Sequence, residues 1–432
     1  MAKAKLIENA AALGLLQFVN LALPVVALPL LAHRLGQDQL GRMAFALSVA
    51  QIFVVLTDYG FSLSGPKTIA LRRDDPAMIT SIWAAITALR AAFTLAGILL
   101  LLILAAMFDR FARDLPLIMS AYAMVVGNIL YPQWLFQGLE RLKMVSAIQV
   151  GARLLAFAAL FIFVKGPRDL YAATFLQASG FLLGGILSLP HTLGVLRQGK
   201  LTRPSRAELR TQLADGWHVF LSSAAVNIYT SSNAFFLGLL APAAMVGQFH
   251  VAERVVRAIQ SLYAPISNAI YPYAARLAAE SPLKLIRFNG RLLAILGGGA
   301  LVGSIVLFAL AGWIVRLMFG DGYSISIMVL RIMAIIPLVV IVSNILGTQT
   351  LLPLGYHKTF SRILLAFALI NFSIFIPLAY WFGAIGAAVA NVMVEIGVTL
   401  SMAGAVYRGA GRPFLQTAMG KCRDDAGFGQ SS

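Results

Sequence analysis

The chain has 432 residues, of which 59% are hydrophobic and 12% are charged. Soluble domains carry about 25% charged residues, so this chain is too apolar for one soluble core and needs lipid as its solvent. The net charge of +17 would suit a nucleic-acid-binding protein, but the basic residues fall in short breaks between apolar runs. Composition therefore predicts an all-α integral membrane protein with no nucleic-acid partner. The single cysteine, Cys422, excludes an internal disulfide.

Apolar runs long enough to cross a bilayer recur along the whole chain. The first follows Lys3 and Lys5 and is too long for a signal-peptide core, so we expect a retained helix. A membrane helix needs about 20 apolar residues. Twelve stretches qualify: 11–32, 41–64, 79–107, 115–138, 144–164, 171–195, 217–240, 246–274, 291–318, 324–351, 362–381 and 384–407. Pro24, Pro265 and Pro337 lie inside these stretches and predict kinks.

The orientation of the chain follows from its basic residues. Alternate breaks, starting with the N-terminus and ending with the C-terminal tail, hold 22 of the 34 Lys and Arg residues, and the opposite breaks hold seven. Cytoplasmic segments of membrane proteins are enriched in Lys and Arg. Both termini are therefore expected in the cytoplasm.

The longest polar break, residues 197–215, divides the expected helices into six and six. An even number per half starts both halves on the same side of the membrane, which makes them parallel repeats. We expect two pseudo-symmetric six-helix lobes, an N-terminal one at 1–200 and a C-terminal one at 201–432 with a short cytoplasmic tail.

Ionisable side chains inside membrane helices are costly and usually face a bundle interior or an aqueous cavity. Away from their ends, the expected helices hold eight charged side chains: Arg90, Arg153, Arg254, Arg257, Arg331, Asp58, Glu253 and Glu395. At about 1.5 Å of rise per residue, Arg90 and Arg153 lie deep in their helices. Each also fits a helix–helix hydrogen bond, or a side chain that snorkels to the head groups.

The stretch GQFHVAERVVRAIQ carries the densest polar pattern. His250, Glu253, Arg254 and Arg257 follow i, i+3, i+4, i+7 and share one helix face. This face is expected to line an aqueous cavity, or to form a buried structural ion pair between Glu253 and Arg257.

The carboxylates raise the question of ion coupling. A proton-coupled cycle needs a group whose charge changes between states, and Asp58, Glu253 and Glu395 are the carboxylates found in the expected helices. Burial raises a carboxylate pKa and a nearby arginine lowers it, which makes Glu253 a candidate. The alternative is a permanent ion pair.

Signals for catalysis are missing from the sequence. It contains no Walker A sequence, no paired-carboxylate site and no metal-ligand spacing. We therefore expect a protein that is not an enzyme, without a metal or other cofactor, and we leave coupling to H⁺ or Na⁺ open.

Five segments resemble Wzx-type polysaccharide flippases. YPQWLFQGLERLKMVS (Tyr131–Ser146) resembles the P-x-W-x-x-Q-G-x-E pattern of that family, and TDYGFSLSGPKTIALRRDD (Thr57–Asp75) resembles its second-helix exit. Val246–Pro272 is similar to its eighth helix. Leu346–Arg362 and Phe382–Glu395 are similar to its tenth to twelfth helices.

This family belongs to the multidrug/oligosaccharidyl-lipid/polysaccharide exporter superfamily. The resemblance implies a V of two lobes around a central cavity, in the bacterial inner membrane. It also implies the substrate, an oligosaccharide repeat unit on undecaprenyl pyrophosphate that is flipped to the periplasmic leaflet by alternating access for O-antigen, capsule or exopolysaccharide synthesis. A polymerase and a chain-length regulator would be partners. The five arginines would then form a cationic lumen for the pyrophosphate.

Two other functions stay open. A cation-coupled drug antiporter of the same superfamily should favour acidic residues in its lumen, whereas arginine dominates here. A membrane-embedded sugar-chain polymerase or ligase usually carries a large periplasmic loop, and every outer break in this chain is short.

Overall fold

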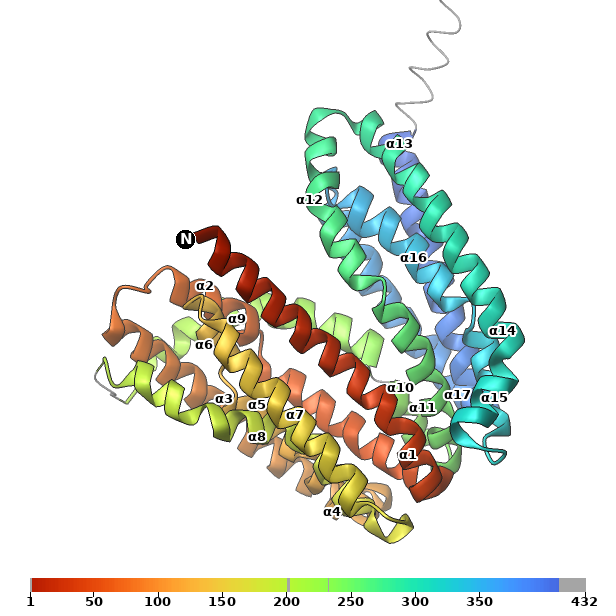
Figure 1. The fold of residues 1–432 in the computed structure, drawn as a ribbon, viewed down its shortest axis with the longest axis horizontal. Coiled ribbons are helices and arrows are strands. Elements are labelled where there is room, and N and C mark those ends of the chain that lie inside the picture. The colour runs from red at the N-terminus through yellow and green to blue at the C-terminus, as the bar shows by residue number, and fades with distance from the viewer. Residues whose placement is uncertain (1, 200–202, 232, 412–432) are drawn as a thin grey trace, which may run out of the picture. The chain divides into compact units, whose positions relative to one another are not determined.

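The computed structural model describes residues 2–199, 203–231 and 233–411 (Figure 1). Cys422 and the rest of the C-terminal tail lie outside the described residues. The chain forms two compact units: unit 1 is Met1–Val251 with Met318–Tyr323, and unit 2 is Ala252–Leu317 with Ser324–Ser432. This division falls at a different place from the polar break near residue 200, and the lobe boundary expected there stays a prediction.

Helices make up the regular structure of the described ranges in both units, which is the arrangement that satisfies backbone hydrogen bonds in lipid. Those of unit 1 are α1 (Ala2–Asp58), α2 (Phe61–Ala70), α3 (Pro76–Met107), α4 (Asp109–Ala121), α5 (Ala123–Leu130), α6 (Gln133–Gly138), α7 (Leu142–Phe163), η1 (Pro167–Asp169), α8 (Leu170–Leu196), α9 (Arg206–Ser231), α10 (Asn233–Leu240) and the first part of α11 (Ala243–Ser261).

Unit 2 begins at Ala252, within α11. Its remaining helices are α12 (Ala264–Glu280), α13 (Pro282–Leu292), η2 (Leu293–Gly297), α14 (Gly298–Phe319), α15 (Ser324–Met333), α16 (Ile336–Leu346), η3 (Gly347–Leu351), α17 (His357–Val406) and η4 (Tyr407–Gly411). The expected break at Pro265 is present, since α11 ends at Ser261 and α12 begins at Ala264. The break at Pro337 is also present, between α15 and α16.

In the described part of the chain, eight helical segments are long and apolar enough to cross a membrane. Large apolar side chains point outward from them: Leu95, Leu99 and Leu102 form one exposed stripe on α3. An outer surface of this kind is stable in lipid. The chain is thus an all-α, multi-pass membrane protein, as the sequence predicts, and the number of twelve crossings stays a prediction.

Two of the eight segments contain a reversal. Helix α1 has 57 residues and would be about 85 Å long at about 1.5 Å per residue, far more than the roughly 30 Å hydrocarbon core. Its backbone leaves the helical region at Gly36, where φ is 74°. In Figure 1 the dark red part of α1 runs to this bend and the lighter part turns back. The bend lies at the sequence-predicted break.

Helix α17 reverses in the same way at Gly383, where φ is 56°. A Cβ on Gly386 would lie 1.8 Å from the carbonyl oxygen of Leu378, so the backbones of the helical segments before and after the bend are in direct contact. Only glycine fits there. The sequence predicts this break as well, between residues 381 and 384.

The core of unit 1 is built around two of the segments that resemble the flippase family. Ile69 of α2, Ile82 of α3 and Trp134 of α6 belong to one buried cluster. Gly65 and Gly138 allow this packing: their Cβ atoms would lie 2.6 Å from the Trp134 ring and from Ile69, respectively. The two motifs therefore pack against each other and hold the end of α2 in place.

Candidate functional site: arginines and carboxylates inside the helices

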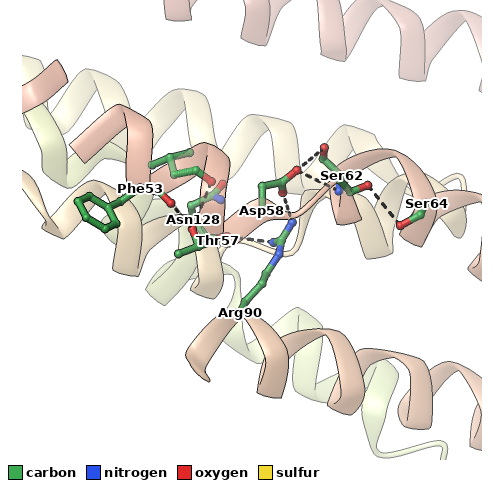
Figure 2. A network of polar contacts seen from close by, with 9 residues as sticks. Phe53, Thr57, Asp58, Ser62, Ser64, Arg90 and Asn128 are labelled. Carbon is green, nitrogen blue, oxygen red and sulfur yellow. Dashed lines mark hydrogen bonds and ion pairs between the residues drawn. The ribbon is translucent and has the colours of Figure 1, made fainter. Parts of the chain in front are cut away.

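Arg90 and Asp58 form a buried ion pair in unit 1 (Figure 2). Arg90 lies on α3 and is 2% exposed, and its guanidinium donates to Asp58 at the end of α1 and, at 3.3 Å, to the carbonyl oxygen of Asn128. Arg90 Nε has no hydrogen-bond partner among the described residues. The two residues are 32 positions apart in the chain and join α1 to α3. This is the helix–helix hydrogen bond that the sequence analysis gave as one alternative for Arg90.

Asp58 has a second structural role. Its carboxylate also accepts from the Ser62 hydroxyl at 2.7 Å and from the Ser62 backbone nitrogen at 3.4 Å, in the first turn of α2. Tyr59 and Gly60 between the two helices have left-handed φ values of 47° and 79°. A left-handed backbone is strained for tyrosine, so the interactions of Asp58 on both sides stabilise this bend.

The same bend touches α9. A Cβ on Gly60 would lie 2.8 Å from the backbone nitrogen of Phe220, which leaves room for glycine alone. The Tyr59 ring stacks on the Phe220 ring at a centroid distance of 5.0 Å. The network around Arg90 and Asp58 therefore fixes the surface on which α9 packs.

Arg153 lies on α7 and contacts α8. Its guanidinium carbon is 4.4 Å from the centroid of the Phe181 ring, a cation–π distance. One turn earlier, Gln149 donates to the carbonyl oxygen of Gly180 at 3.1 Å. Arg153 Nε has no hydrogen-bond partner in the part of the chain that the structure describes.

In unit 2, Glu253 and Arg257 of α11 form an ion pair of 2.8 Å. Glu253 is 6% exposed, whereas the Arg257 side chain is 37% exposed and Arg254 is half-buried. The i, i+4 pair expected from the sequence is therefore present, and the buried partner is the carboxylate.

The last two candidates lie elsewhere in unit 2. Arg331 of α15 is exposed, with its guanidinium carbon 5.8 Å from the Phe308 ring of α14. Glu395 of α17 is half-buried, and its backbone carbonyl accepts from the Thr399 hydroxyl at 2.8 Å. Of the eight predicted residues, the structure thus brings together two pairs, one in each unit. Roles in substrate binding or ion coupling stay predictions for all eight.

Sequence reasoning missed a further ion pair in unit 1. Arg42 Nη2 lies 2.6 Å from Oδ1 of Asp114, and Arg42 Nε donates to the same oxygen at 2.8 Å. Asp114 is 6% exposed. Arg42 and Asp114 are 72 residues apart in the chain, a spacing that gives no signal for this pairing.

A buried polar network in unit 2 was also missed. Gln349, fully buried in η3, donates to the hydroxyl of Ser267 at 2.9 Å, and that hydroxyl donates to Asn344 at 2.8 Å. The Asn289 side chain donates to the backbone carbonyl oxygen of Gln349 at 2.8 Å. The available signals were Asn344 and Gln349, two amides inside the apolar stretch 324–351. Single-turn π-helices such as η3 are frequent at functional sites.

A family model described as "Polysaccharide biosynthesis protein" matches residues 6–278. The chain belongs to this family. Two of its relatives are named "Putative O-antigen transporter". The one from Escherichia coli (strain K12) is 31% identical over 93% of this chain and 96% of its own length. The one from Shigella dysenteriae is 28% identical over 92% and 99%.

Solved structures share the fold of this chain. A lipid II flippase MurJ in an inward closed conformation has a TM-score of 0.72 and 13% identity, covering 93% of this chain and 87% of that one. The eukaryotic MATE transporter AtDTX14 has a TM-score of 0.55 and 13% identity, covering 93% and 95%. At these identities the likeness shows the fold alone. The sequence-based prediction of family and of an all-α membrane fold is confirmed.

The polysaccharide biosynthesis family match covers six of the eight predicted residues. Arg331 and Glu395 lie beyond its end at residue 278. Both ion pairs, Arg90–Asp58 and Arg257–Glu253, lie within it. No group of three His, Cys, Asp or Glu side chains able to hold a metal occurs in the ranges described.

Proposed function

We propose that this protein is a flippase for oligosaccharides linked to undecaprenyl pyrophosphate, serving O-antigen, capsule or exopolysaccharide synthesis. The observation that carries the proposal is the full-length similarity, at 31% identity, to the relative named "Putative O-antigen transporter". The fold shared with a lipid II flippase supports the same class of transport. The relatives of this chain are named as transporters and not as enzymes, which agrees with the missing catalytic motifs in its sequence.

The arginines supply the chemistry that such a substrate needs. A pyrophosphate loses most of its hydration in a low-dielectric layer, and arginine binds phosphate oxygens with two parallel hydrogen bonds. Arg90 and Arg257 are each paired with a carboxylate. In our proposal the phosphate takes the place of the carboxylate as the substrate passes, while Arg153, Arg254 and Arg331 add positive charge. The polyprenyl tail stays in lipid.

Complementation tests the function directly. In a strain that lacks its O-antigen flippase, this protein is expected to restore surface polysaccharide. Arg254→Ala and Arg257→Ala should abolish export, and the corresponding Lys variants should retain part of it, because lysine keeps the charge but loses the two-pronged contact. Arg316→Ala is the control, since Arg316 is exposed at the end of α14.

Surface polysaccharide is measured by gel and antibody staining, and protein abundance by immunoblot. Absence of export with the unaltered protein at normal abundance in the membrane would contradict the flippase function. Normal export by both Ala variants would leave the function standing and would remove these arginines from the substrate path.

The location belongs to the proposal too. We place the protein in the bacterial inner membrane with both termini in the cytoplasm, next to a polymerase and a chain-length regulator. Reporter fusions after Arg203 and after Lys421 should both read cytoplasmic, because the breaks on their side hold 22 of the 34 basic residues. A periplasmic signal from either fusion would reverse the orientation.

A further inference from the structure

A pocket of about 640 Å³ lies within unit 1, between α2, α3 and the start of α9. This volume is in the range of small-molecule sites, roughly 300–1,000 Å³. None of the eight candidate arginines and carboxylates lines it. On the predicted topology its residues belong to the cytoplasmic breaks 65–78 and 196–216 and to the helix ends beside them.

The lining combines both charges with an apolar floor. Lys67 and Arg72, at the end of α2, provide two cations, and Glu208 and Asp215 of α9 provide two carboxylates. No ion pair or side-chain hydrogen bond joins Lys67 or Arg72 to any other described residue. Apolar side chains complete the surface: Leu63, Leu71, Met78, Ile82, Ala85 and Val219.

Gln212 is the residue that points to a ligand. It lines the pocket and is 5% exposed, yet its amide oxygen Oε1 has no hydrogen-bond partner among the described residues. Buried polar atoms almost always have a partner. Glu208, Gln212 and Asp215 recur at helical spacing, so the three residues share one face of α9.

Glu208 keeps the pocket in shape. It accepts from the Ser81 hydroxyl of α3 and from the Ser205 backbone nitrogen at 2.6 Å. The hydrogen bond from Ser81, followed by those from Ser205, holds the pKa of Glu208 below its ordinary range. Glu208 is therefore anionic at neutral pH and ties the start of α9 to α3, while Asp215 and Gln212 keep their acceptors for a ligand.

We propose that this pocket binds the phosphate and the first sugar of the lipid-linked oligosaccharide at the cytoplasmic side, before translocation. Lys67 and Arg72 bind the phosphate, and Gln212 and Asp215 accept from sugar hydroxyls. A phospholipid ammonium group would be satisfied by the carboxylates alone, whereas a buried neutral acceptor beside them suits a hydroxyl donor. The site rests on the proposed function and deepens it.

Binding to the purified full-length protein in detergent tests the site. The probes are a short-chain prenyl pyrophosphate that carries one N-acetylhexosamine, the same prenyl pyrophosphate without sugar, and phosphatidylethanolamine as competitor. Arg72→Gln should weaken both prenyl probes about tenfold, since a charged hydrogen bond is lost. Gln212→Leu should weaken the sugar-bearing probe alone.

The chain offers a matched control for Arg72. The neighbouring Arg73 pairs with Glu140 at 2.9 Å and does not line the pocket, so Arg73→Gln makes the same charge change outside it. Equal effects of Arg72→Gln and Arg73→Gln would overturn the proposal, as would equal weakening of both prenyl probes by Gln212→Leu. Displacement of the sugar-bearing probe by equimolar phosphatidylethanolamine would make the pocket a phospholipid site.

Failure of the pocket and failure of the function look different. If the unaltered protein restores export and Arg72→Gln binds the probes normally, the pocket is not the binding site and the flippase function stands. If the unaltered protein neither exports nor binds the sugar-bearing probe, the function itself is wrong. Gln212→Met, which keeps the side-chain volume, replaces Gln212→Leu if the leucine variant does not fold.

Discussion

Replacing Arg90 by leucine is expected to destabilise the protein by about 3–5 kcal/mol, because removal of one partner leaves a buried charge without compensation. The remaining charge is that of Asp58, whose side chain is 20% exposed and sits at the strained bend between α1 and α2. The expected result is a large loss of folded protein and an earlier thermal transition in detergent.

The double variant Arg90→Met/Asp58→Asn separates charge from packing. Asparagine keeps an acceptor for Ser62, and methionine fills the space of the arginine stem, so the pair is removed without an orphaned charge. We expect it to recover more than half of the stability that Arg90→Leu loses. Lys284→Gln in the exposed Lys284–Glu280 pair is the control and should cost about 0.5 kcal/mol or less. Equal stability of Arg90→Leu and the unaltered protein would refute a stabilising pair.

The second large effect is expected at Gly41, where α1 crosses α11 backbone to backbone. A Cβ on Gly41 would lie 1.7 Å from the carbonyl oxygen of Ala243, and a Cβ on Gly247 would lie 2.1 Å from that of Gln37. Overpacking of this kind costs typically about 1–3 kcal/mol and occasionally more. Since the clash is with backbone, Gly41→Ala should reach the upper end, and Gly41→Leu should give no folded protein.

Gly151 of α7 provides a matched control of opposite sign. Nothing lies within 4 Å of its Cβ position, so Gly151→Ala should be neutral or stabilise by up to about 1 kcal/mol through helix propensity. Thermal unfolding of the purified variants measures both. A transition for Gly41→Ala at or above that of Gly151→Ala would show that α1 and α11 can separate without loss.

Some of this architecture follows from spacing along the chain. Apolar runs of about 20 residues have to be helices in lipid, because no other open backbone satisfies its hydrogen bonds there. Gly36 and Gly383 mark reversals that the sequence already indicates, and the Glu253–Arg257 pair forms because i and i+4 are neighbours on any helix. Helix α1 continues through Pro24, and a kink there stays a prediction.

Tertiary structure decided which distant groups meet. Asp58 and Arg90, like Arg42 and Asp114, are on different helices, and their pairing depends on which helices are neighbours and how each is rotated. Small residues set that arrangement: Gly41 and Gly247 let two backbones touch, and Gly65 and Gly138 admit Trp134 and Ile69. The sequence by itself thus determined the solvent, the helices and the local pairs, because these depend on composition and on i, i+4 spacing. The long-range ion pairs and the pocket beside α9 form only in the packed chain. Which side chains meet between two helices depends on how the surfaces of both helices fit against each other.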